Sequence, residues 1–130
     1  MEIDAACRAL SAALSDQPQL RCLVVLGSRA RGTHHADSDW DLGYLADAGF
    51  DALVLRQVTA AALGPDDIDL VDLDQASGLL RFQAAAQARV VLADPPESWE
   101  RFVLAAARFW CDGGPVIRRA HDAVLEDLRS

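Results

Sequence analysis

One short run, LRCLVVL at residues 20–26, constrains the fold more than any other part of the chain. A run this brief, apolar nearly throughout and partly β-branched, is typical of a strand buried on both faces of a sheet. Apolar residues at helical spacing precede it over about residues 3–15, and Asp16-Gln17-Pro18 ends that pattern. The sequence therefore predicts a helix followed by an inner strand in a layered structure.

The remaining elements alternate in the same way. Strands are expected over residues 40–45, 68–73 and 89–92, and helices over residues 50–61, 76–87, from Asp94-Pro95-Pro96-Glu97 onward, and 116–128. In the Asp94 motif we expect a cap with proline at the first helical position. This order predicts an α+β fold with α/β layers, in which helices pack on a sheet of four or five strands. We expect one domain over residues 1–130, with the last two helices (about 96–128) as a candidate partner interface.

Charge and composition exclude several classes of function. The formal net charge is −8, which argues against nucleic acid as the main partner. All twelve basic residues are arginine, so the chain lacks the lysine of a Walker A motif, of a kinase or of a Schiff base. Phosphate must be bound here by arginine, backbone amides or a metal ion.

Cysteine spacing and hydropathy set further expectations. The three cysteines, Cys7, Cys22 and Cys111, are odd in number and widely separated, which argues against a disulfide framework and a clustered zinc site. The chain has no apolar run of about 18 residues and no basic leader before an apolar segment. We therefore expect a cytoplasmic protein that does not enter a membrane.

Two carboxylates mark the candidate site. Asp39 and Asp41 are two residues apart at the start of a predicted strand, so both side chains leave the same face, with roughly 6.5–7 Å between their Cα atoms. Such a pair repels unless a cation lies between the carboxylates, and oxygen-only ligands suit magnesium or manganese. A third carboxylate on the neighbouring strand would complete a two-metal site, and Asp69 and Asp72 are the alternatives. These two point to opposite faces, so only one can belong to it.

A glycine-bounded polar stretch precedes the acids. Gly27-Ser28 directly follows the buried strand, where a small residue allows close approach of a ligand to the backbone. Arg29 and Arg31 add positive charge, and we expect Arg29 to pair with local acids and Arg31 to contact phosphate or form a surface ion pair. A phosphate-binding turn ten residues before an acid pair predicts a site for a metal–nucleotide complex.

Gly27-Ser28, ten residues and then Asp39-Trp40-Asp41 match the GSx10DxD signature of the DNA polymerase β-like nucleotidyltransferase superfamily. The surrounding GSRARG and SDWDL resemble its minimal nucleotidyltransferase (MNT) branch, whose members commonly serve as antitoxins of HEPN-family RNase toxins. The resemblance extends from the first strand to the third and implies a mixed sheet. Two features depart from the usual pattern: Trp40 is bulky for its position, and His34-His35 makes the loop rich in histidine.

The resemblance also implies roles. Asp39, Asp41 and Asp69 would hold two Mg²⁺ ions, and Asp69, with Asp72 as the alternative, would help to deprotonate the attacking hydroxyl. Gly27, Ser28 and Arg31 would bind the ATP phosphates. The implied reaction is transfer of AMP from ATP to a tyrosine of a HEPN toxin, by in-line attack on the α-phosphate. Transfer to a small molecule such as an aminoglycoside, and inhibition of the partner by occlusion alone, are the alternatives.

An aromatic stripe runs along the helix that follows residue 96. Trp99, Phe102, Phe109 and Trp110 recur at helical spacing. Such a stripe is most simply part of the core, but part of it could instead form a surface for a partner.

Overall fold

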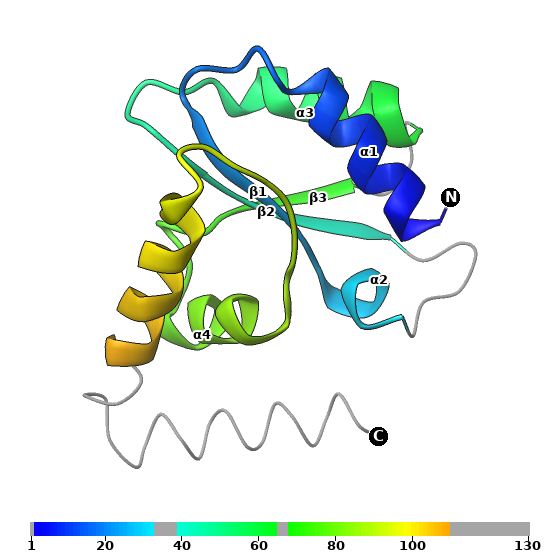
Figure 1. Ribbon diagram of the computed structural model, residues 1–130. Coiled ribbons are helices and arrows are strands. Elements are labelled where there is room, and N and C mark those ends of the chain that lie inside the picture. Colours follow the sequence, from blue (N-terminus) through cyan, green and yellow to red (C-terminus); the bar gives the residue numbers. More distant parts are fainter. Residues whose placement is uncertain (1, 33–38, 65–67, 110–130) are drawn as a thin grey trace.

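A four-stranded mixed sheet organises the described part of the chain. The computed structural model describes residues 2–32, 39–64 and 68–109. The strands are β1 (Leu20–Leu26), β2 (Trp40–Ala46), β3 (Ile68–Asp72) and β4 (Arg89–Ala93), in the order β3-β2-β1-β4. β1 is antiparallel to both of its neighbours, whereas β2 and β3 are parallel (Figure 1). The predicted fold class and the predicted central position of β1 are confirmed.

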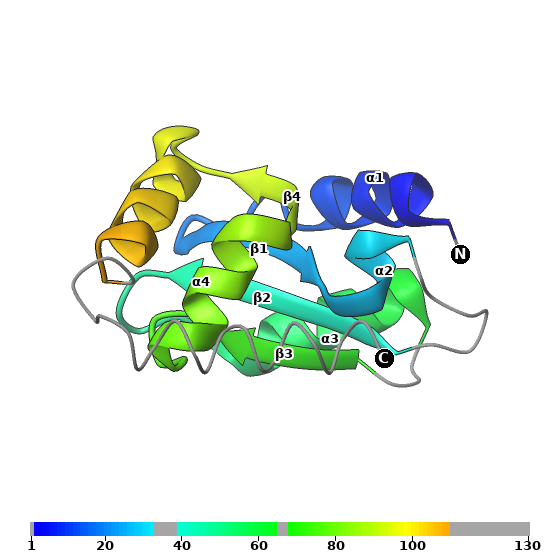
Figure 2. The same ribbon diagram turned by 90° about the horizontal axis from the view of Figure 1, so that it is seen from below.

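Helices cover both faces of this sheet. α1 (Ile3–Ala13) and α3 (Ala52–Leu63) lie side by side on one face, and α4 (Gly78–Gln87) and a helix over residues 97–109 lie on the other (Figures 1 and 2). The short α2 (Gly27–Arg31) continues directly from the end of β1. Among the described residues, no helix has both the length and the apolar character needed to cross a bilayer.

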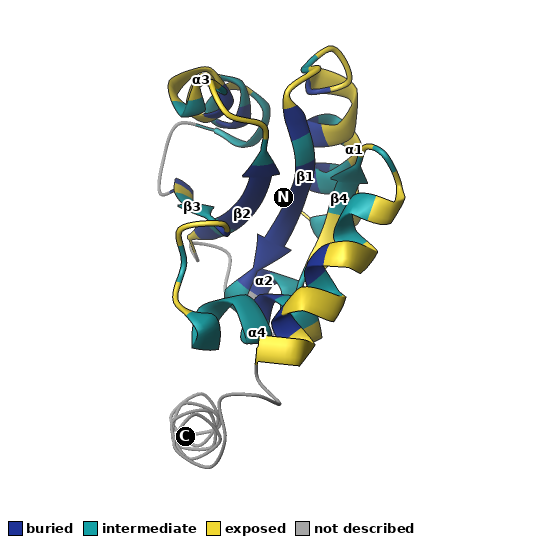
Figure 3. Ribbon diagram, turned by 90° about the vertical axis from the view of Figure 1, so that its left-hand side faces the viewer, coloured by how far each residue is buried: buried dark blue, intermediate teal, exposed yellow. Residues whose placement is uncertain are grey.

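The core is divided between the two faces of the sheet, as the alternation of side chains along a strand requires. Leu23 and Val25 of β1 belong to the cluster under α1 and α3, whereas Cys22 and Val24 belong to the cluster under α4. All four side chains are fully buried, and Figure 3 shows β1 as a buried strand between the largely buried β2 and the partly covered β4. The prediction of a strand buried on both faces is confirmed.

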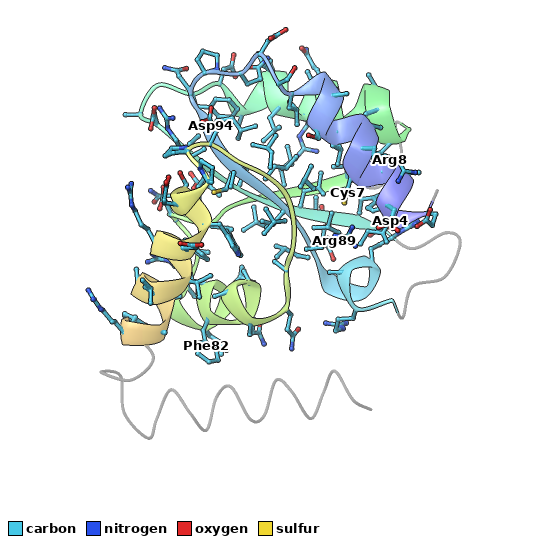
Figure 4. All side chains as sticks on the ribbon, viewed as in Figure 1. Asp4, Cys7, Arg8, Phe82, Arg89 and Asp94 are labelled. Carbon is cyan, nitrogen blue, oxygen red and sulfur yellow. The ribbon has the colours of Figure 1, made fainter. Side chains whose placement is uncertain are left out.

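Two ion pairs connect elements that are distant in sequence. Arg89 of β4 donates to Asp4 of α1 at 2.7 Å, and both side chains lie at the surface where α1 crosses the sheet edge (Figure 4). Arg21 of β1 binds Asp47, just beyond β2, through its Nε at 3.0 Å and through its Nη2. The same Arg21 donates to the carbonyl of Asp94, so this end of the sheet is held by side chains as well as by the backbone.

Two local predictions are wrong. The helix expected to start at the Asp94 motif begins at residue 97, and the Asp94–Pro95 peptide bond before it is cis. The reason is that the Asp94 amide donates to the carbonyl of Arg21 at 2.7 Å, which keeps this residue with the sheet.

The helix expected over residues 50–61 begins two residues later. The Asp51 side chain caps it by accepting from the Leu53 amide at 2.9 Å. Leu53 in its first turn is 61% exposed, and Leu55 and Thr59 take the inward positions. The predicted last helix over residues 116–128 lies outside the described residues, as do His34, His35, Trp110 and Cys111.

Candidate active site

The ends of three neighbouring elements meet beside α2. Leu26, the last residue of β1, pairs with Asp41 of β2, and Asp41 pairs in turn with Asp69 of β3. Since Gly27 follows Leu26 directly, the turn into α2 lies next to Asp41, and Asp69 lies one strand further on. The sheet register thus joins residues that are up to 43 positions apart in the chain.

These residues line one cavity of about 450 Å³ between the sheet and α4. Gly27, Arg31, Asp41 and Asp69 form its charged part. The remainder of the lining comes from β1, β3 and the region of α4 and is apolar except for two glutamines: Leu26, Leu70, Val71, Leu80, Gln83, Ala84, Gln87 and Ala88. The volume lies within the range of about 300–1,000 Å³ that is usual for small-molecule sites.

Gly27 cannot be replaced without disturbing this cavity. Its φ of +69° lies in the left-handed region, which residues with a Cβ rarely adopt. A Cβ built at this position would lie 2.5 Å from Oδ2 of Asp41 and 3.5 Å from its Cγ. The glycine therefore serves both the turn into α2 and the placement of the Asp41 carboxylate.

The electrostatics of the cavity centre on Asp41. Partial burial raises the pKa of the Asp41 carboxyl above 3.8, the negative charges of Asp69 and Asp39 raise it further, and Arg31 lowers it. Both neighbouring acids therefore act on Asp41. The ionised form of Asp41 is disfavoured in this surrounding, and a bound cation would favour it.

The other expected acids lie in different positions. Asp39 is exposed, immediately before β2, and is not part of the cavity lining. Asp72 pairs with Tyr44 and lines a separate cavity, and its Oδ1 accepts from the Asp74 amide at 3.0 Å. Of the two alternatives on β3, Asp69 is therefore the one beside Asp41.

No three His, Cys, Asp or Glu side chains converge closely enough to hold a metal ion, as far as the chain is described. The repulsion among carboxylates of like charge opposes such convergence. The oxygen donors of Asp41 and Asp69 nevertheless occupy paired positions on adjacent strands, with Asp39 close enough to raise the Asp41 pKa.

Trp40 does not obstruct the site, because its side chain leaves the opposite face of β2. It belongs to the core cluster under α1 and α3, and the Arg29 guanidinium lies 4.1 Å from the centre of its ring. Trp40 and Arg29 are each only 4% exposed. This contact between α2 and β2 was missed from the sequence, although strict alternation around Asp39 and Asp41 already places Trp40 on the other face.

Sequence reasoning also missed Gln83, and only the packing of α4 against the sheet shows that it lines the cavity. Ser28 occupies the second position of α2.

The family model for polymerase beta nucleotidyltransferases matches residues 8–97, which include β1, α2, β2, β3 and β4 and hence Asp39, Asp41, Asp69 and Asp72. The chain belongs to this family. The predicted family and its mixed-sheet fold are thereby confirmed, and the chain is a nucleotidyltransferase by descent.

Two curated relatives are both called protein adenylyltransferase MntA. The protein from Aphanizomenon flos-aquae (strain 2012/KM1/D3) is 32% identical over 101 residues, which cover 68% of this chain and 67% of the relative. The protein from Shewanella oneidensis is 39% identical over 75 residues, which cover 55% of this chain and 53% of the relative.

Solved structures are similar along nearly the whole chain. A crystal structure of a toxin–antitoxin with AMP-PNP has a chain with a TM-score of 0.69 and 27% identity, covering 95% of this chain and 98% of that one. A structure of the tri-AMPylated Shewanella oneidensis HEPN toxin in complex with MNT antitoxin gives a TM-score of 0.64 at 24% identity, covering 100% of both chains, and is similar in fold.

Proposed function

We propose that this chain is a magnesium-dependent adenylyltransferase that transfers AMP from ATP to a tyrosine of a HEPN-family RNase toxin and so acts as the antitoxin. The observation that carries the proposal is that Asp41 and Asp69 pair on adjacent strands and line one cavity, with Gly27 against Asp41 at the start of α2. The names of the curated relatives and the AMP-PNP in a similar toxin–antitoxin structure support it. The same proposal places the reaction in the cytoplasm, where ATP is available.

The donor set suits Mg²⁺. Asp39, Asp41 and Asp69 supply only carboxylate oxygens. Partial burial, and then the negative charges of Asp69 and Asp39, raise the pKa of Asp41, and nearby Arg31 does not cancel this effect. We assign the ion-holding role to these three residues, for two ions. Bound Mg²⁺ would neutralise the phosphate charge that develops as the leaving group departs.

The other residues of the cavity position the nucleotide. The backbone at Gly27 and Ser28 and the charge of Arg31 bind the pyrophosphate portion of ATP. A tyrosine hydroxyl of the partner attacks the α-phosphorus in line, and its proton passes to the Asp69 carboxylate. The new bond joins the tyrosine oxygen to the α-phosphorus, the bond to the bridging oxygen breaks, and pyrophosphate leaves.

We propose that the end of the chain provides the partner surface of this single domain. In the helix over residues 97–109, Phe102 is buried and stacks on Trp99, which confirms part of the aromatic stripe as core. Leu104 and Phe109 of the same helix are 59% and 49% exposed. Phe109 lies beside Gly78 of α4, whereas Leu104 points to another side of the helix, so Leu104 is the exposed apolar side chain that suits a protein partner.

Two labelled forms of ATP test the reaction. The chain is incubated with Mg²⁺, a HEPN-family toxin from the same genome, and ATP labelled at either the α- or the γ-phosphate. We expect the toxin to acquire label from the α-phosphate and none from the γ-phosphate. Label from γ-ATP would mean phosphoryl transfer and would overturn the proposal.

One variant tests the partner surface, and another separates catalysis from occlusion. Leu104→Asp is expected to weaken the complex with the toxin while leaving AMP-PNP binding unchanged. If an Asp39→Asn/Asp41→Asn variant still inhibits the toxin fully, occlusion is sufficient. Label on an added aminoglycoside without any protein acceptor would instead favour the small-molecule alternative.

A further inference from the structure

One polar group in the cavity lining has no partner. Gln83 of α4 lines the same cavity as Asp41 and Asp69, and its Nε2 is buried without a hydrogen-bond acceptor among the described residues. An amide donor that is removed from water without an acceptor costs free energy, so such groups are rare unless a ligand or an ordered water completes them. The amide therefore marks a place where a ligand acceptor belongs.

The surroundings of Gln83 indicate the kind of ligand. Val71, Leu80 and Ala84, from β3 and α4, contribute apolar lining to the same cavity. A flat ring suits apolar walls, and a polar edge of that ring suits the amide between them. Since the cavity also holds the acids and Gly27, a ligand that spans it carries charge in one part and a ring in another.

We propose that Gln83 reads the nucleobase of the bound nucleotide and selects adenine over guanine; this inference rests on the proposed function. A carboxamide offers one donor and one acceptor side by side. Adenine presents the complementary pair, an N7 acceptor and an N6 donor, whereas guanine presents two acceptors, N7 and O6. Nε2 donates to N7, and Oε1 accepts from N6. Against guanine, Oε1 faces O6 without a proton between them.

The size of the preference follows from this pairing. A two-bond amide–adenine contact discriminates against the wrong base by roughly ten- to a hundredfold. Loss of the amide removes that discrimination, because the apolar walls accept either purine.

The experiment measures binding without turnover. Affinities of AMP-PNP and GMP-PNP are determined by calorimetry with Mg²⁺ for the full chain, for Gln83→Leu and for Gln83→Glu, which keeps the shape but removes the donor. Gln57→Leu is the matched control: it makes the same substitution at an exposed helical glutamine, on α3, that does not line the cavity. Thermal melting verifies that each variant is folded.

We expect the wild-type chain to bind AMP-PNP roughly ten- to a hundredfold more tightly than GMP-PNP, and Gln83→Leu to bring this ratio close to one, mainly by weaker AMP-PNP binding. Gln83→Glu should also weaken AMP-PNP binding but keep part of the preference, because its carboxylate still accepts from N6 and still faces O6 of guanine. Gln57→Leu should keep the ratio. An unchanged ratio in folded Gln83→Leu would overturn the inference and assign the buried amide to an ordered water only. A wild-type chain that binds both nucleotides equally would overturn it too. Absence of binding to either nucleotide would instead overturn the proposed function itself.

Discussion

Gly27 offers the sharpest test of how the turn after β1 builds the site. We predict that Gly27→Ala folds but loses most of its adenylyl transfer. The φ of +69° alone costs a residue with a Cβ about 1–2 kcal/mol of stability. For a domain of this size that corresponds to a fall in melting temperature of roughly 4–8 °C.

The effect on the reaction follows from the contact with Asp41. The new Cβ would lie 2.5 Å from Oδ2, while ordinary contact begins at 3.4 Å, so the carboxylate must move by about 0.9 Å. A displacement of about 1 Å in a reacting group can lower the rate roughly a hundredfold. We therefore expect kcat to fall by about two orders of magnitude.

The chain contains a matched control. Gly32 has a similar φ of +75°, but a Cβ there would meet nothing within 4 Å. Gly32→Ala should consequently lose a similar amount of stability while retaining near-normal transfer. Both variants are compared by thermal melting and by the rate of label transfer from α-labelled ATP. Full activity in Gly27→Ala, or an equal loss of activity in Gly32→Ala, would refute the reasoning.

Three further predictions concern single contacts. Asp41→Asn should abolish transfer yet raise the melting temperature in the absence of Mg²⁺, because it removes a partly buried charge beside Asp69 and Asp39. Mg²⁺ should stabilise the wild-type chain and not the variant. A lower melting temperature of the variant without Mg²⁺ would be contrary evidence. Arg29→Ala should reduce the free energy of unfolding by about 1–2 kcal/mol in urea titrations through loss of the contact with Trp40, and an unchanged value would show that the contact contributes nothing. Hydrogen bonding to Arg21 lowers the pKa of Asp47 below 3.8, so this pair stabilises the fold above that pH and ceases to do so as the pH falls through the lowered value. The difference in melting temperature between wild type and Asp47→Asn should accordingly be present at pH 7 and shrink at pH 3, and a difference that is the same at both values would disprove the assignment.

Hydrophobic periodicity predicted the four strands and the longer described helices, but not the short α2. The run at residues 20–26 coincides with β1, because only an inner strand between two helical layers can bury apolar side chains on both faces. The starts of helices were harder to predict, because they depend on competing hydrogen bonds. Both residues are aspartates, yet the Asp51 side chain caps α3, whereas the backbone amide of Asp94 donates to the carbonyl of Arg21 in β1.

In the candidate site, features set by local spacing could be predicted from the sequence, whereas contacts set by long-range packing could not. Gly27 and the Asp39–Asp41 pair lie in one segment, so their motif can be recognised from the sequence alone. The choice of Asp69 over Asp72 depends on the register between β2 and β3, which only the sheet fixes. Gln83 belongs to α4, a helix of ordinary composition, and its place in the cavity depends on how that helix packs. For the same reason, the contact of Arg29 with Trp40 was not predicted.

The intact mass of the toxin shows whether this site transfers AMP to it. A HEPN-family toxin from the same genome is incubated with this chain and Mg-ATP, and in parallel with the Asp39→Asn/Asp41→Asn variant. We predict that the toxin gains the mass of one or more AMP groups on a tyrosine with the wild-type chain, and none with the variant. A toxin of unchanged mass in a stable complex with the wild-type chain would contradict the account.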